Sequence, residues 1–411
     1  MAPARQVLIA GAGIGGLSAA LAIARTGIHV DVLEQAQQLE EAGAGIQLSP
    51  NATRILTDLG LAERLKATVV APDAIRVMNA GNAREIVRIP LGQKAEARYG
   101  APFWVIHRAD LQAALAEAVR AHTDITLSLG TRVEDYVVHA NGVTVQTRKF
   151  GQIGEQQCGV LIGADGLWSA VRSRLRRERP PIFRHRTAWR ALVPAADVLP
   201  LWRQPVVHLW LGREAHLVHY PVKGGALINI VAIADDEWQA TTWNAVGSRE
   251  EVLRRFSRWD WAEQARALLG VPEHWAKWAL YDRKKPHRGR GPVALIGDAA
   301  HPMLPFLAQG AAMAIEDGAV LAAHLSRQPD RPVRALRAYE KERARRTRRA
   351  QKAARRQGRI YGRFGPEGAI RNLVMKWLGG DKLLARYDWV YQWRAPTATP
   401  IPLPPPDPSP E

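Results

Sequence analysis

The chain has 411 residues, of which 47% are hydrophobic, so it is long enough for two or three domains and too apolar to be a disordered protein. Its single cysteine, Cys158, excludes an intramolecular disulfide and a zinc site of several cysteines, and it favours a reducing compartment. The net charge of +18 would suit a nucleic acid, but no zinc-finger, RNA-recognition or helix-turn-helix pattern accompanies it, so we expect no specific nucleic-acid partner.

Residues 5–34 predict a strand, a glycine turn, a helix and a second strand, which together form one βαβ unit. The turn reads "GAGIGG", and Gly11, Gly13 and Gly16 fit the G-x-G-x-x-G pattern. These glycines permit a tight turn, a close approach of pyrophosphate to the backbone, and close packing of helix on strand. Glu34 closes the second strand, where a carboxylate can hold ribose hydroxyls. The unit predicts a dinucleotide site, against the alternative of a glycine-rich turn without a nucleotide.

The uncharged stretch 7–24 could be mistaken for a membrane span or a signal peptide. Its glycines divide it into a short strand and a helix, so we predict no transmembrane segment and a cytoplasmic protein. Further along, Pro50 begins a helical stretch and 108–122 has helical apolar spacing. Consecutive strands are predicted at 125–130, 132–140, 142–150 and 159–166.

From about 182 to 235 the apolar pattern changes to period two, which predicts antiparallel sheet. The stretch "AHLVHYPV", 215–222, is one such strand. Residues four apart on a strand share a face, so His216 and Tyr220 should point together and His219 away from them. They could serve a substrate, or they could be a polar pair on a solvated face.

The βα pattern returns at 293 with "ALIGDAAHPML", followed by a predicted helix at 309–326. Asp298 ends its strand after a glycine, as Asp165 does in "GADG". Ligands bind at the carboxyl ends of strands in open α/β sheets, although a turn acid or a helix cap would explain either residue alone. His301 follows among prolines, and it could face a ligand or only hydrogen-bond within its loop.

The segment 341–359 carries ten basic residues and one acid. It could bind nucleic acid or an anionic membrane, but we favour the solvated face of a C-terminal helix. The proline-rich tail, 395–411, is predicted to be disordered.

The ordered motifs "GAGIGG … E … IHRADL … GADG … GDAAHP" resemble those of the class A flavoprotein monooxygenases, the para-hydroxybenzoate hydroxylase type, over residues 5–345. The resemblance implies an FAD site in which the first motif, with Ile14, and Glu34 hold the ADP half. Arg108 and Asp165 match family residues that contact FAD or NAD(P)H. Asp298 matches the acid that binds the ribityl chain. The loop 305–311, with Pro305, Gly310 and Ala311, would lie against the flavin ring.

Within that family the chain is most similar to the salicylate, 3-hydroxybenzoate and 6-hydroxynicotinate hydroxylases. The resemblance implies that His216 deprotonates a phenol and that Tyr220 orients it. Arg190 could meet a substrate carboxylate. Two departures concern the substrate: Gln47 stands where the 6-hydroxynicotinate enzymes have a histidine near the flavin, and Gly310 and Ala312 replace a glycine pair of some salicylate enzymes.

The implied fold class is α/β: a Rossmann-like FAD-binding domain interrupted by a mixed or antiparallel substrate-binding sheet, with C-terminal helices. The predicted parts of the FAD-binding domain are 1–72, 101–180 and 286–345. Those of the substrate domain are 73–100 and 181–285. A helical segment, 346–394, and the tail complete the chain.

The implied activity is insertion of one oxygen atom from O2 into a phenolic or hydroxylated heteroaromatic acid such as salicylate, with FAD and NADH or NADPH, by way of a flavin hydroperoxide and without a metal. The chain could also pair with a second copy as a homodimer. A flavin epoxidase and a non-catalytic flavin-binding protein are the alternatives. One cysteine cannot provide the C-x-x-C of a disulfide reductase, and "WDWAEQ" lacks the Ile-Pro of the flavin halogenases.

Overall fold

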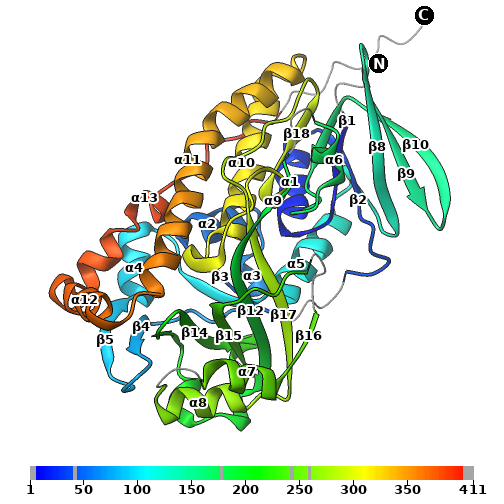
Figure 1. The fold of residues 1–411 in the computed structure, drawn as a ribbon. Helices are drawn as coiled ribbons and strands as arrows, with labels where there is room; N and C mark the ends of the chain where they lie inside the picture. The colour runs from blue at the N-terminus through cyan, green and yellow to red at the C-terminus, as the bar shows by residue number, and fades with distance from the viewer. Residues whose placement is uncertain (1–5, 40–43, 176–178, 241–244, 258–260, 401–411) are drawn as a thin grey trace, which may run out of the picture.

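A five-stranded parallel sheet and an eight-stranded mixed sheet make up most of the β structure (Figure 1). The computed structural model describes residues 6–39, 44–175, 179–240, 245–257 and 261–400. A three-stranded and a two-stranded sheet complete the β structure of these residues. The predicted fold class, an α/β protein with a Rossmann-like unit, a second mixed sheet and C-terminal helices, is confirmed.

The parallel sheet has the strand order β18-β11-β1-β2-β7. Its strands are short, and all but the edge strand β7 are mostly buried, as expected of a sheet that is covered on both faces. They are β1 (Gln6–Ala10), β2 (His29–Leu33), β7 (Ile125–Ser128), β11 (Val160–Gly163) and β18 (Val293–Leu295). The strand β1 lies at the centre of the sheet, between β11 and β2. The glycine turn that follows β1 therefore lies at the carboxyl ends of the central strands.

Helices and a small sheet cover the two faces of the parallel sheet. One core contains apolar residues of three helices: α1 (Ile14–Ala24), α5 (Arg108–Arg120) and α10 (Gly310–Arg327). A second core lies under an antiparallel sheet and two short helices. These elements are β8 (Thr131–His139), β9 (Gly142–Lys149), β10 (Gln152–Cys158), α6 (Ala170–Ser173) and α9 (Gly297–Ala300). In Figure 1 the small sheet projects at the upper right.

The eight-stranded sheet has the order β16-β17-β12-β15-β14-β13-β4-β5, and only the β13–β4 pair is parallel. Its strands are β4 (Ala74–Asn79), β5 (Glu85–Pro90), β12 (Ile182–Pro194), β13 (Val206–Leu211), β14 (Ala215–Val222), β15 (Leu227–Asp235), β16 (Ala245–Ser248) and β17 (His274–Asp282). Helices α7 (Arg249–Phe256) and α8 (Glu263–Gly270) cover one face over a tryptophan-rich core. Part of the opposite face packs against the C-terminal helices, and the rest borders a cavity.

Smaller elements connect the two halves. A two-stranded sheet pairs β3 (Gly45–Leu48) with β6 (Trp104–His107), and β6 also contacts β14 of the large sheet. Helix α2 (Pro50–Asp58), which begins at the predicted proline, packs on α10. The remaining short helices here are α3 (Ala62–Leu65) and α4 (Gly92–Tyr99).

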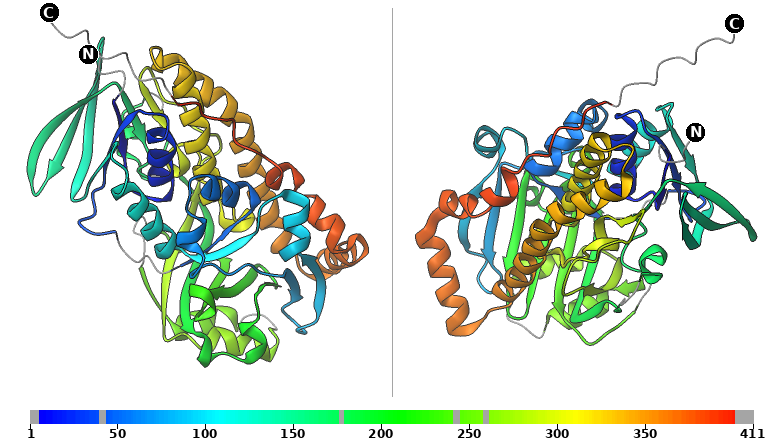
Figure 2. Two further views of the ribbon diagram at one scale, coloured as in Figure 1. Left: turned by 180° about the vertical axis from the view of Figure 1, so that it is seen from behind. Right: turned by 90° about the horizontal axis from the view of Figure 1, so that it is seen from above.

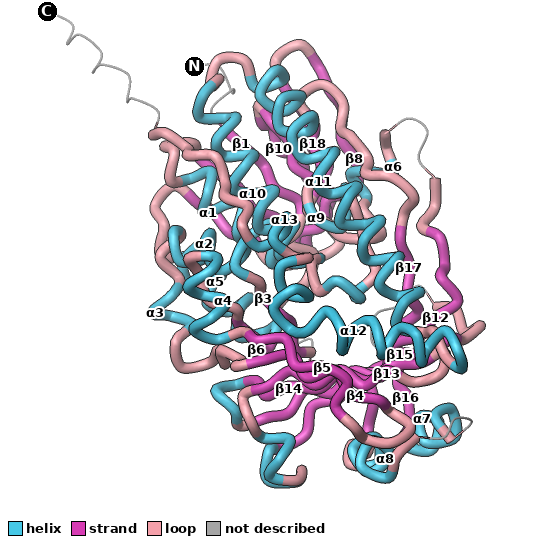
Figure 3. The backbone as a smooth tube through the Cα atoms, turned by 90° about the vertical axis from the view of Figure 1, so that its left-hand side faces the viewer, coloured by secondary structure: helices cyan, strands magenta, loops and turns pink. Residues whose placement is uncertain are grey.

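Three helices end the described chain: α11 (Pro332–Tyr361), α12 (Gly365–Ala385) and α13 (Asp388–Tyr391). The long helix α11 runs beside α10, and Figure 2 shows it from behind and from above. Helix α12 then turns back to pack against β5, as Figure 3 shows. Among the described helices, none is both long and apolar enough to span a bilayer.

The basic segment 341–359 lies within α11. Seven of its ten basic side chains are exposed, in line with the expected solvated helix face. The other three were not expected to point inward: Arg343 and Arg346 pair with Glu316, and Arg355 pairs with Asp282. Part of the charge run therefore holds the fold together.

The predicted helix at 108–122 is α5, and the one at 309–326 is α10. The period-two strands are found as β13, β14 and β15. Of the proline-rich tail, residues 401–411 lie outside the described part, and Thr397 accepts a hydrogen bond from Arg327. The domain boundaries drawn from the sequence stay predictions, although β4 and β5 do join the large sheet.

Candidate active site

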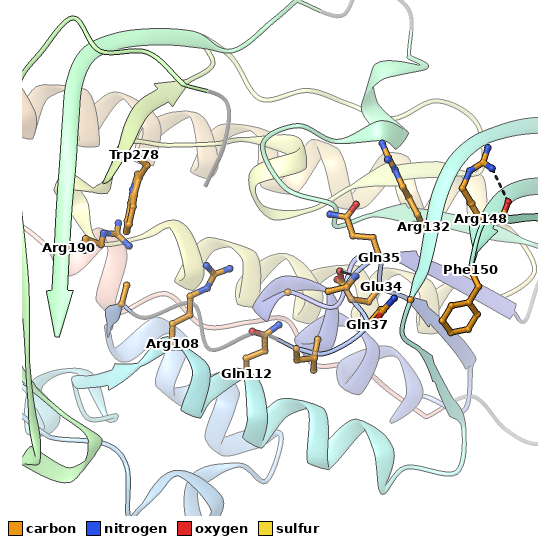
Figure 4. A pocket seen from close by; sticks show the side chains of 16 residues that line it. Glu34, Gln35, Gln37, Arg108, Gln112, Arg132, Arg148, Phe150, Arg190 and Trp278 are labelled. Carbon is orange, nitrogen blue, oxygen red and sulfur yellow. Dashed lines mark hydrogen bonds between the residues drawn. The ribbon is translucent and has the colours of Figure 1, made fainter. Parts of the chain in front are cut away.

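Two hollows meet between the parallel sheet and the large sheet. A groove of about 770 Å³ runs past Gly13 and Glu34 (Figure 4), and a cavity of about 430 Å³ lies between the large sheet and the loop after β18. Four residues line both: Gly13, Arg108, Arg190 and Trp278. The two hollows therefore form one continuous path, of a kind that could hold an extended dinucleotide with a small molecule at its end.

The glycine motif shapes the start of this path. Gly11 has φ +108°, and a side chain there would come within 2.7 Å of the carbonyl oxygen of Ala164. A side chain on Gly16 would meet the carbonyl oxygen of Gly11. At Gly13 nothing lies within 4 Å of an added Cβ atom, so this position is open to a ligand. The three glycines thus have the three geometries that pyrophosphate binding at a helix N-terminus needs.

Glu34 follows β2 and lines the groove. Its carboxylate accepts hydrogen bonds from the backbone N–H of Ala12 at 2.7 Å and of Ala36 at 2.9 Å. Gln112 on α5 donates to the carbonyl oxygen of Ala12 at 2.9 Å. These bonds fix the carboxylate beside the glycine turn, where the ribose of a bound dinucleotide would lie.

Arg108 and Asp298 lie where the groove becomes the cavity. Arg108 begins α5, and burial lowers its pKa while the charge of Asp298 acts in the opposite sense. Burial raises the pKa of Asp298, against the opposing charges of His301 and Arg108. The two side chains are thus electrostatically coupled, as expected if they share the polar chain of one ligand.

Asp165 lies beside the path rather than in it. Its neighbours Ala164 and Gly166 line the cavity, whereas the Asp165 carboxylate accepts the backbone N–H of Val171 in α6 at 3.0 Å. Burial raises its pKa, and its Oδ1 atom is buried without a hydrogen-bond partner among the described residues. The structure therefore shows a turn and cap role for Asp165, and its contact with FAD or NAD(P)H stays a prediction.

The loop after β18 forms the floor of the cavity. Pro305, Phe306 and the first residues of α10, Gly310 and Ala311, line it, with Ile14 of α1 nearby. Among the side chains that could cap α10, none accepts its first N–H groups. Those N–H groups and the helix dipole are available to stabilise negative charge on a ligand ring.

His301 turns away from the cavity. Its Nε2 lies 2.6 Å from Oδ2 of Asp317 on α10, and the ring is buried. Asp317 also accepts the N–H of Gly297 at 2.8 Å and the Nε–H of Arg343 at 2.6 Å. Burial alone would raise the pKa of Asp317, but the charges of His301 and Arg343 outweigh it and hold that pKa below the ordinary value. Of the two alternatives for His301, the geometry favours hydrogen bonding, to Asp317 of α10 as well as within its loop, and a role of His301 in catalysis stays a prediction.

A second buried acid extends this network. Glu316 accepts hydrogen bonds from Arg343 and Arg346 of α11, and from the side-chain amide of Asn51 on α2. Gln309, at the start of α10, donates to the hydroxyl of Ser49 at 2.8 Å. The network fastens the cavity floor to three helices.

His216 and Tyr220 line the cavity from β14, with Val218 between them. Both are about 3% exposed, so the alternative of a solvated polar pair is wrong. His219 points to the other face of the sheet, where its ring stacks on His208 at 4.4 Å. Burial, and then the charge of Arg186, lower the pKa of His216 to about 3, so its imidazole is neutral at physiological pH and offers a ring nitrogen that can accept a hydrogen bond.

Arg190 enters the cavity from β12. Its guanidinium carbon lies 3.9 Å above the ring centroid of Trp278 on β17, and burial lowers its pKa to about 10. The arginine therefore remains charged near neutral pH. A buried cation over an aromatic face can receive a carboxylate in a fixed orientation. Gln47, on β3, lines the same cavity.

Two residues at the site were missed from the sequence: Asn229, beside the cavity, and Trp278, which lines it. Asn229 on β15 accepts the N–H of Gly45 at 2.7 Å, and a side chain on Gly45 would meet both Asn229 and Tyr220. A polar residue within the apolar run "ALINIVAIA" was the available signal. Trp278 gave no such signal, because an aromatic residue in an apolar segment usually belongs to the core.

The residues present fit FAD. The open space at Gly13 suits a pyrophosphate, and the partly buried Asp298, which lines the cavity, suits the polyol that follows. The α10 N-terminus faces the cavity where a flavin ring would end. These residues follow one another along the path in the order of the chemical groups of an extended FAD molecule: pyrophosphate, polyol and flavin ring.

Comparison with known proteins agrees with an FAD site. The profile of the family described as "FAD binding domain" matches residues 4–354. The chain is 37% identical over 396 residues to the 3-hydroxybenzoate 6-hydroxylase of Klebsiella oxytoca. The aligned region covers 96% of this chain and 98% of the relative. The chain belongs to the FAD-dependent aromatic hydroxylases. It is also 33% identical over 332 residues to the 6-hydroxynicotinate 3-monooxygenase of Pseudomonas fluorescens, covering 78% of this chain and 83% of that one.

Among solved structures, this FAD-dependent aromatic hydroxylase is similar to a salicylate hydroxylase in complex with its substrate. The TM-score is 0.77 at 27% identity, over 94% of this chain and 95% of the other. The resemblance to class A flavoprotein monooxygenases is thereby confirmed, as are FAD as cofactor and monooxygenation as reaction class. Salicylate, the substrate that the sequence analysis named first, is not confirmed.

Proposed function

We propose that this enzyme hydroxylates a benzoate that carries a phenolic hydroxyl, with 3-hydroxybenzoate as the first candidate. The observation that carries the proposal is the joint presence of Arg190 and the His216–Tyr220 pair in one cavity, because one side suits a carboxylate and the other a phenol. The relatives that are 36–37% identical over more than nine tenths of this chain include three named 3-hydroxybenzoate 6-hydroxylases.

In this proposal each cavity residue has a task. Arg190 binds the carboxylate and so orients the ring. The neutral His216 accepts the phenolic proton, which makes the ring more electron-rich, and Tyr220 holds the phenol oxygen in place. Phe306 and Tyr361, whose ring centroids lie 5.4 and 5.3 Å from that of His216, exclude water from the imidazole. Bound FAD, reduced by NAD(P)H, supplies the activation of O2 and the transfer of one oxygen atom.

Oxygen uptake tests the substrate class. Purified holoenzyme would be given NADH or NADPH with 3-hydroxybenzoate, salicylate, 6-hydroxynicotinate or 3-amino-4-hydroxybenzoate, and the products identified by mass spectrometry and chromatography. We expect 3-hydroxybenzoate to give one equivalent of dihydroxybenzoate per O2 consumed. Benzoate itself, which lacks the phenol, should give hydrogen peroxide only.

Two outcomes would count against the proposal. Coupled hydroxylation of 6-hydroxynicotinate but not of any hydroxybenzoate would move the substrate to the pyridine acids. If phenols without a carboxylate are hydroxylated as efficiently as the hydroxybenzoates, Arg190 does not bind a substrate carboxylate. The choice between NADH and NADPH, a homodimer and a cytoplasmic location remain predictions.

A further inference from the structure

The turn between β9 and β10 contains a residue that its own backbone does not favour. Phe150 and Gly151 form the two-residue loop, since Lys149 pairs directly with Gln152. Both loop residues have positive φ, at 49° and 82°. Two-residue hairpin loops with positive φ at both positions strongly prefer Asn-Gly, because a bulky side chain is strained there.

Core packing does not explain the phenylalanine either. Its side chain is 77% exposed, so it leaves an aromatic ring in solvent and gains little from burial. A residue that breaks a local rule without a gain elsewhere in the fold is a reason to look for a function.

The ring lies at the far end of the groove described above (Figure 4). A side chain added to Gly130 would begin 3.9 Å from Cζ of Phe150 and 3.8 Å from Cγ of Gln37. The N–H of Gly130 donates to the carbonyl oxygen of Ala36, two residues after Glu34. Phe150 is therefore held beside the segment that follows the ribose-binding carboxylate.

Two arginines lie on the same wall of the groove. Arg132 on β8 and Arg148 on β9 are directly paired across the strands, where two like charges oppose each other. Glu134 accepts two hydrogen bonds from Arg148, at 2.6 and 3.0 Å. Cations beside an exposed aromatic ring are a combination that binds nucleobases and their phosphates.

We propose that Phe150 stacks on the adenine ring of a dinucleotide bound in this groove. The positions along the groove follow the order of the chemical groups: Gly13 for pyrophosphate, Glu34 for ribose, and then Phe150 for the base. The adenine is that of FAD, whose pyrophosphate and ribose this same groove would hold at Gly13 and Glu34. The strained turn then has a reason, because it places the phenylalanine where an asparagine would leave the base without a partner.

The variant Phe150→Asn tests this proposal with little risk to folding. Asparagine tolerates the left-handed backbone, so the hairpin should keep or gain stability while the ring is lost. FAD release from the holoenzyme on dilution, followed by flavin fluorescence, gives the FAD affinity. Rapid-mixing reduction of the bound flavin by NADH and by NADPH gives the affinity for the pyridine nucleotide. Stacking on an aromatic side chain predicts a weakening of about 5- to 150-fold in the affinity for FAD, with the affinity for NAD(P)H unchanged.

Two matched variants separate stacking from structure. Phe150→Trp keeps a stacking surface and should retain wild-type affinity. Ile153→Thr removes an apolar side chain that is 59% exposed on the same hairpin but outside the groove, and it should change neither affinity. The unfolding midpoint at saturating FAD should be unchanged or higher in Phe150→Asn.

The outcomes divide cleanly. Weaker FAD binding with rescue by tryptophan supports the proposal, whereas weaker NAD(P)H binding with unchanged FAD release overturns it. If both affinities of Phe150→Asn stay within twofold of wild type, or if Ile153→Thr has the same effect, the proposal is overturned. Neither measurement depends on which aromatic acid is the substrate.

Discussion

His301 and Asp317 form a buried pair, with Nε2 of the imidazole 2.6 Å from Oδ2 of the carboxylate. The carboxylate also holds the N–H of Gly297 and the guanidinium of Arg343. Asp317 thus ties the end of β18 and the cavity floor to helix α11. Its task is to keep in place the loop on which the flavin ring would rest.

Asp317→Asn should therefore lower FAD retention and stability together. Loss of one partner of a buried ion pair typically costs ~3–5 kcal/mol, because the other charge is left buried. Flavin content after gel filtration and the free energy of unfolding in denaturant would measure the two effects. The control is Asp381→Asn, whose partner Lys94 and whose own side chain are mostly exposed, and which should change stability by less than about 1 kcal/mol. Full FAD content and wild-type stability in Asp317→Asn would contradict this role.

Arg190→Met should raise the KM for a hydroxybenzoate more than it lowers kcat. The methionine keeps apolar contact with Trp278 but removes a charge-assisted hydrogen bond, worth ~1.5–3 kcal/mol or about 10- to 150-fold. The matched measurement uses the corresponding hydroxybenzamide, which lacks the negative charge. The variant should discriminate between acid and amide far less than wild type does. An unchanged acid-to-amide ratio would mean that the carboxylate binds elsewhere.

His216→Ala should keep FAD and still oxidise NAD(P)H, but should form mainly hydrogen peroxide. Loss of a positioned base typically lowers the rate of the chemical step ~100- to 10,000-fold. Because the pKa of His216 is about 3, protonation of this histidine should not limit the wild-type enzyme between pH 6 and 8. In the variant, coupling should rise with pH, as solution supplies the phenolate. Product and peroxide yields across that range would measure both effects.

His219 supplies the control for His216, although not as an alanine variant. It is fully buried against His208 and Trp202, so truncation would leave a hole in the core. His219→Leu keeps most of the volume and should leave coupling near wild type. If His219→Leu uncouples the reaction and His216→Ala does not, the assignment of the two strand faces to their roles is wrong.

The buried histidines predict acid sensitivity. Burial is the largest cause that lowers the pKa of His208 to about 4, of His216 to about 3, and of His219 well below its ordinary value. Each is neutral when folded and takes up a proton when unfolded below about pH 6.5, so stability is present above that pH and falls as the pH drops towards 4. With three such histidines, the free energy of unfolding should fall by up to ~4 kcal/mol for each pH unit below about pH 6.5. Denaturant unfolding at pH 5 and 7 would measure it, and His208→Leu combined with His219→Leu should flatten it.

The glycine turn and the cavity-facing side of β14 were predictable from the sequence because the constraints on both are local. Gly11, Gly13 and Gly16 lie in one turn, and the period-two pattern of 215–222 placed His216 and Tyr220 on one face. The rest depended on distant partners. His301 is explained by Asp317, sixteen residues later on another element, and the inward arginines of α11 by acids on α10 and β17. A charge run looks the same in sequence whether its partner is water or a buried carboxylate.

The late position of β18 in the chain bears on how the protein is made. This strand joins the parallel sheet beside β11, yet the substrate sheet lies between the two in the sequence. At ~5–20 residues per second, a ribosome needs roughly 15 to 60 s to pass from the glycine turn to β18. During that time the nascent sheet lacks an edge strand, and its core lacks α10 and α11. Because the loop after β18 and the start of α10 line the site, we expect FAD binding to follow the synthesis of both. A chain that stalls earlier would leave apolar surface of the parallel sheet uncovered.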